Sequence, residues 1–296
     1  MKVELIAELS GHAAPVYAIH ADGKLLYSAS SDRMLASWSV HLNEPNPFSV
    51  KAESGIYCFS ISASFLILGC SSGNVHVIDL AAKKEIKNFK VHKKGVYSIK
   101  LLVDKDLLIT GGGDGIVNFF KLSTLELIRS IKISSLKIRT FLYDEALELL
   151  YAGCGEGMVR MFELDYFNEV NSFRASEESV NEIINHPSKP LLITTGKDGH
   201  IHFWKKDTLE KFRSIAAHNM TIYKLAISPD NKLAASVSRD KSIKLWEVDS
   251  FNILKKIDRR MDKGHSHSVN DISWINEKEF FSAGDDRIIR RWKVAE

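Results

Sequence analysis

The chain has 296 residues, of which 45% are apolar and 26% are charged, and its formal net charge is +3 at pH 7. This composition indicates a soluble globular protein, and the small net charge argues against a dedicated electrostatic track for nucleic acid. No apolar run approaches about 18 residues, and the opening segment MKVELIAELS carries two glutamates, so neither a membrane span nor a signal peptide is predicted.

The three cysteines, Cys58, Cys70 and Cys154, lack the spacing of metal ligands and have apolar neighbours. They are expected to be reduced, buried thiols. Reduced thiols favour a cytoplasmic protein, with the nucleus as the alternative in a eukaryotic cell.

Seven copies of one pattern follow one another along the chain. In each copy, an acidic residue or serine in a short turn precedes a large apolar residue by six positions. The turn positions are Asp32, Ser72, Asp114, Glu156, Asp198, Asp240 and Asp286, and the apolar positions are Trp38, Ile78, Phe120, Phe162, Trp204, Trp246 and Trp292. Successive copies are 40, 42, 42, 42, 42 and 46 residues apart, so the chain is predicted to be an array of one repeated unit.

Each copy is predicted to form a small antiparallel sheet. In the sixth copy, strands are expected over residues 222–228, 233–238, 243–248 and 252–257. Glycine follows the turn position in copies 2 to 5, where a tight turn requires positive φ (Gly73, Gly115, Gly157 and Gly199). Four strands in a period of about 40 to 45 residues are typical of a β-propeller blade.

Histidine, Ser/Thr, Asp and Trp recur in this order within the copies. Three copies hold the full set: His12, Ser28, Asp32 and Trp38; His218, Ser236, Asp240 and Trp246; His265, Ser282, Asp286 and Trp292. The third copy has Phe120 in place of tryptophan, the fifth lacks only the histidine, and copies 2 and 4 have neither Ser/Thr nor Asp. The set resembles the buried hydrogen-bonded tetrad of the WD-repeat family. The resemblance covers residues 2–294 and implies an all-β, seven-bladed WD-repeat propeller.

The two ends of the chain predict how the ring of blades closes. The strand before each new copy has apolar residues nine, six and three positions before the histidine position, and Val3, Ile6 and Leu9 repeat this spacing before His12. The chain stops four residues after Trp292. Residues 2–9 are therefore expected to complete blade seven, and residues 1–296 are expected to form a single propeller domain.

The polar motifs favour structural roles. Because His, Ser and Asp repeat in several copies, they are interpreted as buried hydrogen-bond networks, and no catalytic residue is predicted. No Gly-Lys-Ser/Thr follows the glycines at 111–113, so nucleotide binding is not expected. His200 and His202 lack a third ligand of similar placement and are expected on an exposed strand face. Neither a metal nor another cofactor is predicted.

One position on the inner strand gathers residues suited to binding. Five residues after the histidine position stand Tyr17, Tyr57, Tyr97, Arg139, Asn181, Tyr223 and Asn270. The resemblance implies that this position lies at the top rim of the channel. It implies the same for the residue just before each turn position, which is Lys197 in copy 5 and Arg239 in copy 6. Lys137 adds a further cation in copy 4. About five extra residues before the seventh copy, among them Arg259 and Arg260, are expected to extend the basic patch in a loop on the same face.

These residues favour a non-catalytic scaffold or adaptor that binds a peptide or protein partner on the top face. Tyr and Arg are enriched in interface hot spots, and the cations suit an acidic or phosphorylated partner. The alternative is a nucleic-acid-associated WD-repeat protein, because tyrosines beside Arg and Lys also suit bases and phosphates. A third possibility is an enzyme at the channel mouth, which the lack of paired carboxylates on the predicted rim disfavours. No membrane partner is expected.

Overall fold

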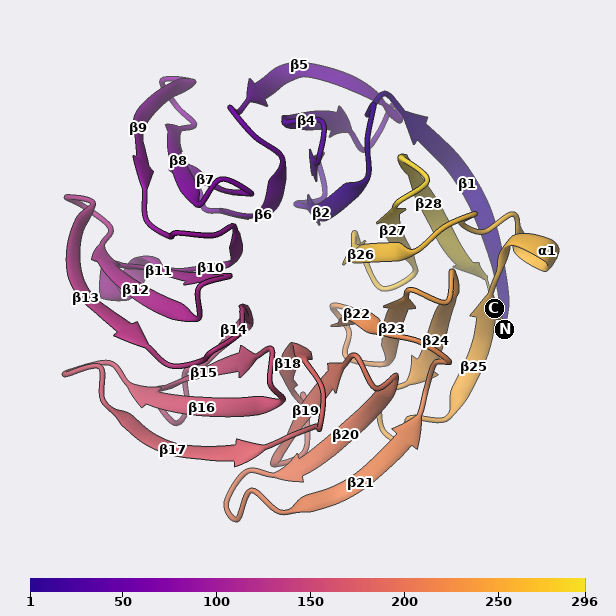
Figure 1. Cartoon of the computed structure of the whole chain (residues 1–296). Helices are drawn as coiled ribbons and strands as arrows, with labels where there is room; N and C mark the ends of the chain where they lie inside the picture. Colours follow the sequence, from indigo (N-terminus) through magenta and orange to yellow (C-terminus); the bar gives the residue numbers. More distant parts are fainter. Residues whose placement is uncertain (296) are drawn as a thin grey trace. The chain divides into compact units, whose positions relative to one another are not determined.

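The chain is all-β. The computed structural model describes residues 1–295 and contains seven four-stranded antiparallel sheets, shown in Figure 1. The predicted seven-bladed β-propeller is confirmed. Two short helical segments are described in addition, η1 (Val103–Lys105) and α1 (Arg259–Asp262). Among the described residues there is no helix with the length and apolar character that crossing a membrane requires.

The chain divides into two compact units, of which the first comprises residues 1–56 together with residues from 216 onward. This unit holds blades 1, 6 and 7. Its strands are β2 (Val16–Ala21), β3 (Leu25–Ser30), β4 (Met34–Ser39) and β5 (Glu44–Lys51) in blade 1; β22 (Ile222–Ile227), β23 (Leu233–Ser238), β24 (Ile243–Glu247) and β25 (Ile253–Ile257) in blade 6; and β26 (Val269–Trp274), β27 (Glu279–Gly284), β28 (Ile288–Ala295) and β1 (Lys2–Ser10) in blade 7. In blade 6, predicted and observed strand ends differ by no more than one residue.

The second unit spans residues 57–215 and holds blades 2 to 5. Its strands are β6 (Ile56–Ile61), β7 (Phe65–Cys70), β8 (Asn74–Asp79) and β9 (Lys84–Lys90) in blade 2; β10 (Val96–Leu102), β11 (Leu107–Gly112), β12 (Ile116–Lys121) and β13 (Glu126–Lys132) in blade 3; β14 (Ile138–Asp144), β15 (Leu149–Cys154), β16 (Met158–Glu163) and β17 (Glu169–Arg174) in blade 4; and β18 (Val180–Asn185), β19 (Leu191–Gly196), β20 (His200–Lys205) and β21 (Lys211–Ala216) in blade 5.

The tight turn between the second and third strands has the same backbone form in all blades. The predicted glycines occupy it in blades 2 to 5 with positive φ, for example +74° at Gly115. A Cβ atom on Gly115 would lie 2.1 Å from the carbonyl oxygen of Ser134, so the adjoining backbone leaves no room for a side chain. In blades 1, 6 and 7, Arg33, Lys241 and Arg287 adopt positive φ at this turn.

The N-terminal strand completes the last blade, as predicted. β1 pairs antiparallel with β28 from Lys2 opposite Ala295 to Ser10 opposite Ile288. Figure 1 shows the two strands and the two chain ends side by side. A β-bulge lies at Ile6, whose side chain is exposed, whereas Val3 and Leu9 are buried.

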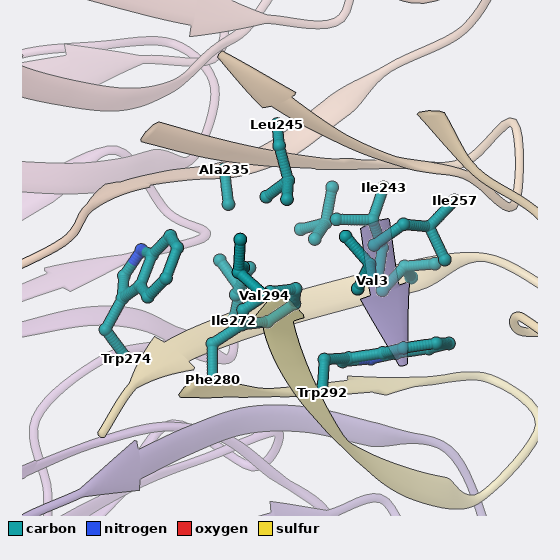
Figure 2. Packing of buried hydrophobic residues seen from close by; sticks show 12 residues of the cluster. Val3, Ala235, Ile243, Leu245, Ile257, Ile272, Trp274, Phe280, Trp292 and Val294 are labelled. Carbon is teal, nitrogen blue, oxygen red and sulfur yellow. The ribbon is translucent and has the colours of Figure 1, made fainter. Parts of the chain in front are cut away.

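The hydrophobic core fills the space between neighbouring sheets. Figure 2 shows the cluster between blades 6 and 7, in which Leu245 and Ile257 of blade 6 face Phe280 and Trp292 of blade 7. Val3 of β1 belongs to the same cluster, so the N-terminal strand contributes to packing as well as to backbone pairing. Losing β1 would remove this apolar contact and leave β28 as an unpaired edge.

We expect Leu9→Ala to lower the free energy of unfolding by about 2 to 5 kcal/mol, because it opens a cavity at a side chain that is 3% exposed. Ile6→Ala on the same strand, at a side chain that is 44% exposed, should change it by less than about 1 kcal/mol. Denaturant unfolding followed by tryptophan fluorescence measures both. Deleting residues 1–9 should have a larger effect than either, with aggregation; unchanged stability after this deletion would contradict the role of β1.

Candidate functional site

The three complete His-Ser-Asp-Trp sets are hydrogen bonded within their blades. In blade 6, His218 Nδ1 lies 3.0 Å from Asp240 Oδ2, His218 Nε2 lies 2.7 Å from Ser236 Oγ, and Trp246 Nε1 donates to Ser236 Oγ at 2.9 Å. The sets that begin with His12 and His265 repeat these bonds at 2.8 to 2.9 Å. These hydrogen bonds satisfy the imidazole, hydroxyl, carboxylate and indole groups of each tetrad. This supports a structural role for the tetrads.

In the blade 6 tetrad, the surroundings keep His218 neutral and Asp240 charged. Burial lowers the pKa of His218, although Asp240 acts in the opposite direction. Burial by itself would raise the pKa of Asp240, but hydrogen bonds from His218 and Ser242 outweigh it and hold this pKa below its usual value. With its proton on Nδ1, His218 donates to Asp240 and accepts from the Ser236 hydroxyl, which itself accepts from the indole.

Blade 5 corrects the expectation that His202 lies on an exposed strand face. His202 is 7% exposed, and its Nε2 lies 2.8 Å from Asp198 Oδ2. Ser176, at the position of the missing histidine, donates to the same oxygen at 2.9 Å. Trp204 donates to Thr194 Oγ1 at 2.9 Å. Two residues therefore share the role of the histidine, because the partly buried carboxylate of Asp198 still needs hydrogen-bond donors.

His202 belongs to a position that the sequence interpretation did not use, two residues before the large apolar residue of each copy. In blade 7, Arg290 at this position donates to Asp286 Oδ2 at 2.8 Å and forms an ion pair with Glu8 of β1, with Nε 2.9 Å from Oε1. In blade 3, Asn118 donates to the carbonyl of Val91 at 2.8 Å. The seven residues are Ala36, His76, Asn118, Arg160, His202, Lys244 and Arg290. Polar residues at six of seven equivalent positions were the available signal.

In the second unit, five residues of the predicted rim and its flanks form a continuous series, here called the tyrosine–cation row. The rings of Tyr57 and Tyr97 stack with centroids 5.1 Å apart at 29°. The Lys137 ammonium lies 5.1 Å and the Arg139 guanidinium 5.5 Å from the centroid of Tyr97. Arg139 Nε donates to Asn181 Oδ1 at 3.2 Å. The series thus runs through blades 2, 3, 4 and 5.

Close backbone approach positions this row. A Cβ atom on Gly113, in the tight turn of blade 3, would lie 2.9 Å from Cε2 of Tyr97. The Tyr97 ring therefore rests directly on this backbone. Asn181, expected at an accessible rim, is 6% exposed and accepts from Ser179 Oγ at 3.0 Å as well as from Arg139. Its amide oxygen thus accepts from two side chains of the protein, one of which is Arg139 of the row.

Positive charge accumulates at one end of the row. The pKa of Lys137 is lowered by burial and by the charges of Arg139 and Lys197. Lys197 is exposed and pairs with Glu178, with Nζ 2.8 Å from Oε1. Burial and the neighbouring Tyr57 raise the pKa of Tyr97, so its phenol keeps the proton. A bound anion would relieve the repulsion among the cations.

The other predicted rim residues lie in the first unit. Tyr17 on β2 and Tyr223 on β22 are half-buried, and Arg239 is exposed. Asn270 on β26 donates through Nδ2 to the Val16 carbonyl at 2.9 Å and to Asp285 Oδ1 at 2.8 Å. The amide nitrogen of Asn270 therefore donates to two acceptors within the protein.

Arg259 and Arg260 lie on α1, so the expected loop is a single helical turn. Asp258 caps it by accepting from the backbone N–H groups of Arg260 and Met261. Figure 1 shows α1 after β25 and beside β1, the outermost strand of blade 7, so both arginines lie next to the outer edge of that blade.

The chain belongs to the WD-repeat family. The family model described as "WD domain, G-beta repeat" matches residues 3–39, 83–121, 167–205, 209–247 and 258–293, which together cover well over half of the chain. The stretches without a match contain the apolar positions of copies 2 and 4, in which the Ser/Thr and Asp of the tetrad are absent. No curated protein matches the chain.

Asp240→Ala should lower the free energy of unfolding by about 1 to 3 kcal/mol, because the buried His218 and the N–H of Ser242 in the turn lose their acceptor. Asp104→Ala, at an exposed carboxylate in η1, serves as the control and should stay within about 0.5 kcal/mol of the parent. Both values come from urea unfolding. Equal losses in the two variants would refute a structural role for the tetrad.

Stability should fall with acid in two steps. Burial lowers the folded-state pKa of His92, His218 and His265, so their contribution is complete above the unfolded value of about 6.5 and declines below it. Asp198, where hydrogen bonds led by that from His202 outweigh burial, has a pKa of about 2; its contribution is complete above about pH 4 and is lost as the pH falls through 2.

Urea unfolding between pH 8 and pH 2 should therefore give a plateau above about pH 7, a decline from about 6.5 and a steeper one below about 4. The variant Asp198→Asn should make the lower step smaller and leave the upper step unchanged, because other aspartates with a lowered pKa, such as Asp240, still contribute to the lower step. A free energy that stays constant from pH 7 to pH 4 would show that the buried histidines titrate as in the unfolded chain.

Proposed function

We propose that this protein is a non-catalytic scaffold that binds an acidic segment of a partner protein over the tyrosine–cation row. WD-repeat propellers generally act as protein-interaction scaffolds and are typically not enzymes. The observation that supports the acidic character of the partner is the position of Lys137 and Arg139 over the ring of Tyr97. Tyr and Arg are also the side chains that most often dominate interface energetics.

Lys137 supplies the strongest electrostatic argument. Its ammonium is half-buried, and within residues 1–295 no carboxylate forms an ion pair with it. After burial, the charges of Arg139 and Lys197 are the causes that lower its pKa. A half-buried cation among other cations is best stabilised when it donates a charge-assisted hydrogen bond to an anionic acceptor on another molecule. A carboxylate or phosphate of the partner would provide this acceptor, with the phenols of Tyr57 and Tyr97 as additional donors.

The same contacts disfavour nucleic acid as the ligand. Sequence-tolerant binding of single strands relies on open aromatic faces on which bases stack. β10, which carries Tyr97, packs against β7 on one side and β14 on the other. Tyr57 stacks on Tyr97 from blade 2, and Arg139 contacts it from blade 4. A base could stack on Tyr97 only after displacing one of these internal partners.

Affinity capture from nuclease-treated lysate, with quantification of every captured partner, tests the proposal. Lys137→Glu with Arg139→Glu, and separately Tyr57→Ala with Tyr97→Ala, should reduce capture at least about tenfold, and added salt should weaken capture by the parent protein. Lys83→Glu with Lys84→Glu, two exposed lysines at the β8–β9 turn, is the matched charge control and should capture normally.

Thermal unfolding must show that each variant remains folded. Capture that survives both row variants would place the partner elsewhere on the molecule. Capture that disappears after nuclease treatment would instead favour the nucleic-acid alternative.

A further inference from the structure

The segment between blades 6 and 7 is longer than its counterparts. Trp246 and His265 are 19 residues apart, whereas Trp204 and His218 are 14 residues apart. The added residues belong to no strand of either blade and form α1 with its flanks. A blade needs none of these residues for its sheet, so the insertion is free to serve another purpose.

The two acidic residues of the insertion form hydrogen bonds and ion pairs within the protein. Asp258 accepts from the N–H groups of Arg260 and Met261 at 3.0 and 3.2 Å, and its carbonyl accepts from Gly264 N at 3.1 Å. Asp262 forms an ion pair with Lys255 at 2.7 Å, and the side chain of Asp262 is 8% exposed. These bonds order the turn before any partner arrives, which reduces the entropy lost on binding.

Four other side chains of the insertion are exposed to solvent. Met261 is 82% exposed, the highest value among the large apolar side chains of residues 1–295. Arg259, Arg260 and Lys263 are exposed, and within the same residues none of them forms an ion pair with a carboxylate. An ordered, protruding apolar side chain surrounded by unpaired cations is characteristic of a recognition surface.

We propose that this surface, here called the α1 knob (Arg259, Arg260, Met261 and Lys263), docks onto an acidic site of a partner protein that offers an apolar pocket to Met261. The positive charges of the α1 knob favour a pocket with acidic residues at its rim. Each arginine can also donate two parallel hydrogen bonds to one carboxylate.

A membrane is a poorer fit for the α1 knob than a protein pocket. Amphipathic helices that bind bilayers present a continuous apolar face along several turns. α1 has four residues and one exposed apolar side chain, with arginines on the same turn. The docking is also independent of the tyrosine–cation row, since it rests on a different segment and on none of the residues of the row.

Methionine-methyl NMR tests the proposal locally. The chain has six methionines, and the signal of Met261 is identified by its loss in Met261→Leu. The probe is a short synthetic peptide in which glutamates flank a central pair of leucines. Adding it should shift the Met261 signal and leave the other methionine signals in place. A peptide with glutamine for glutamate, or serine for leucine, should bind at least about tenfold more weakly.

Two variants separate the α1 knob from the tyrosine–cation row. Arg259→Glu with Arg260→Glu should weaken the peptide-induced shift of Met261 at least about tenfold, whereas Lys137→Glu with Arg139→Glu should leave it unchanged. The proposal is overturned if the acidic peptide does not shift Met261, or if the glutamine peptide shifts it equally. It is also overturned if only vesicles of equal parts phosphatidylcholine and phosphatidylserine shift it, or if the signal moves with protein concentration alone, which would indicate a second copy.

Discussion

The hydrogen bonds accepted by the partly buried aspartate of the tetrad are the interactions on which the rest of each complete blade depends. In blade 1, Asp32 accepts from His12, from the N–H of Ala13 and from the N–H of Met34. One carboxylate thus ties the loop that enters the inner strand to the tight turn between the second and third strands. A four-stranded blade is too narrow to hide these polar groups in any other way, and each donor left without an acceptor would cost about 1 to 3 kcal/mol.

The same bonds determine the position of the tyrosine–cation row. Tyr97 lies five residues beyond His92, and its ring rests on Gly113, the residue before Asp114. His92 and Asp114 are themselves joined at 3.0 Å, so the two segments that support the ring are fixed to each other. Presenting an aromatic ring beside cations therefore requires no flexible loop. A rigid row of this kind loses little conformational entropy when a partner binds.

The sequence predicted the repeat, the seven sheets and the completion of blade 7, because a fixed spacing is preserved even where individual residues change. The prediction from sequence was wrong where the function of a missing residue was taken over by a residue on a different strand. His202 and Ser176 divide the role of one histidine, and this exchange becomes visible only when the strands are paired. Asn181 shares its position with Tyr97, but its short side chain lies below the surface and supports Arg139. Spacing places a residue on a strand, whereas side-chain length decides whether it reaches the solvent.

The two blades that depart most from the repeat supply most of the tyrosine–cation row in the second unit. Blades 2 and 4 lack the Ser/Thr and Asp of the tetrad, yet they contribute Tyr57, Lys137 and Arg139 to the row. Contacts of these residues with Tyr97 and Asn181 join neighbouring blades through side chains, whereas a tetrad joins segments within one blade. The row therefore links blades 2 and 4, which lack the Ser/Thr and Asp of the tetrad, to blades 3 and 5, which keep them. If a ligand bridged Lys137 and the phenols, as proposed above, it would strengthen this link, and its binding would then be coupled to the order of blades 2 to 5.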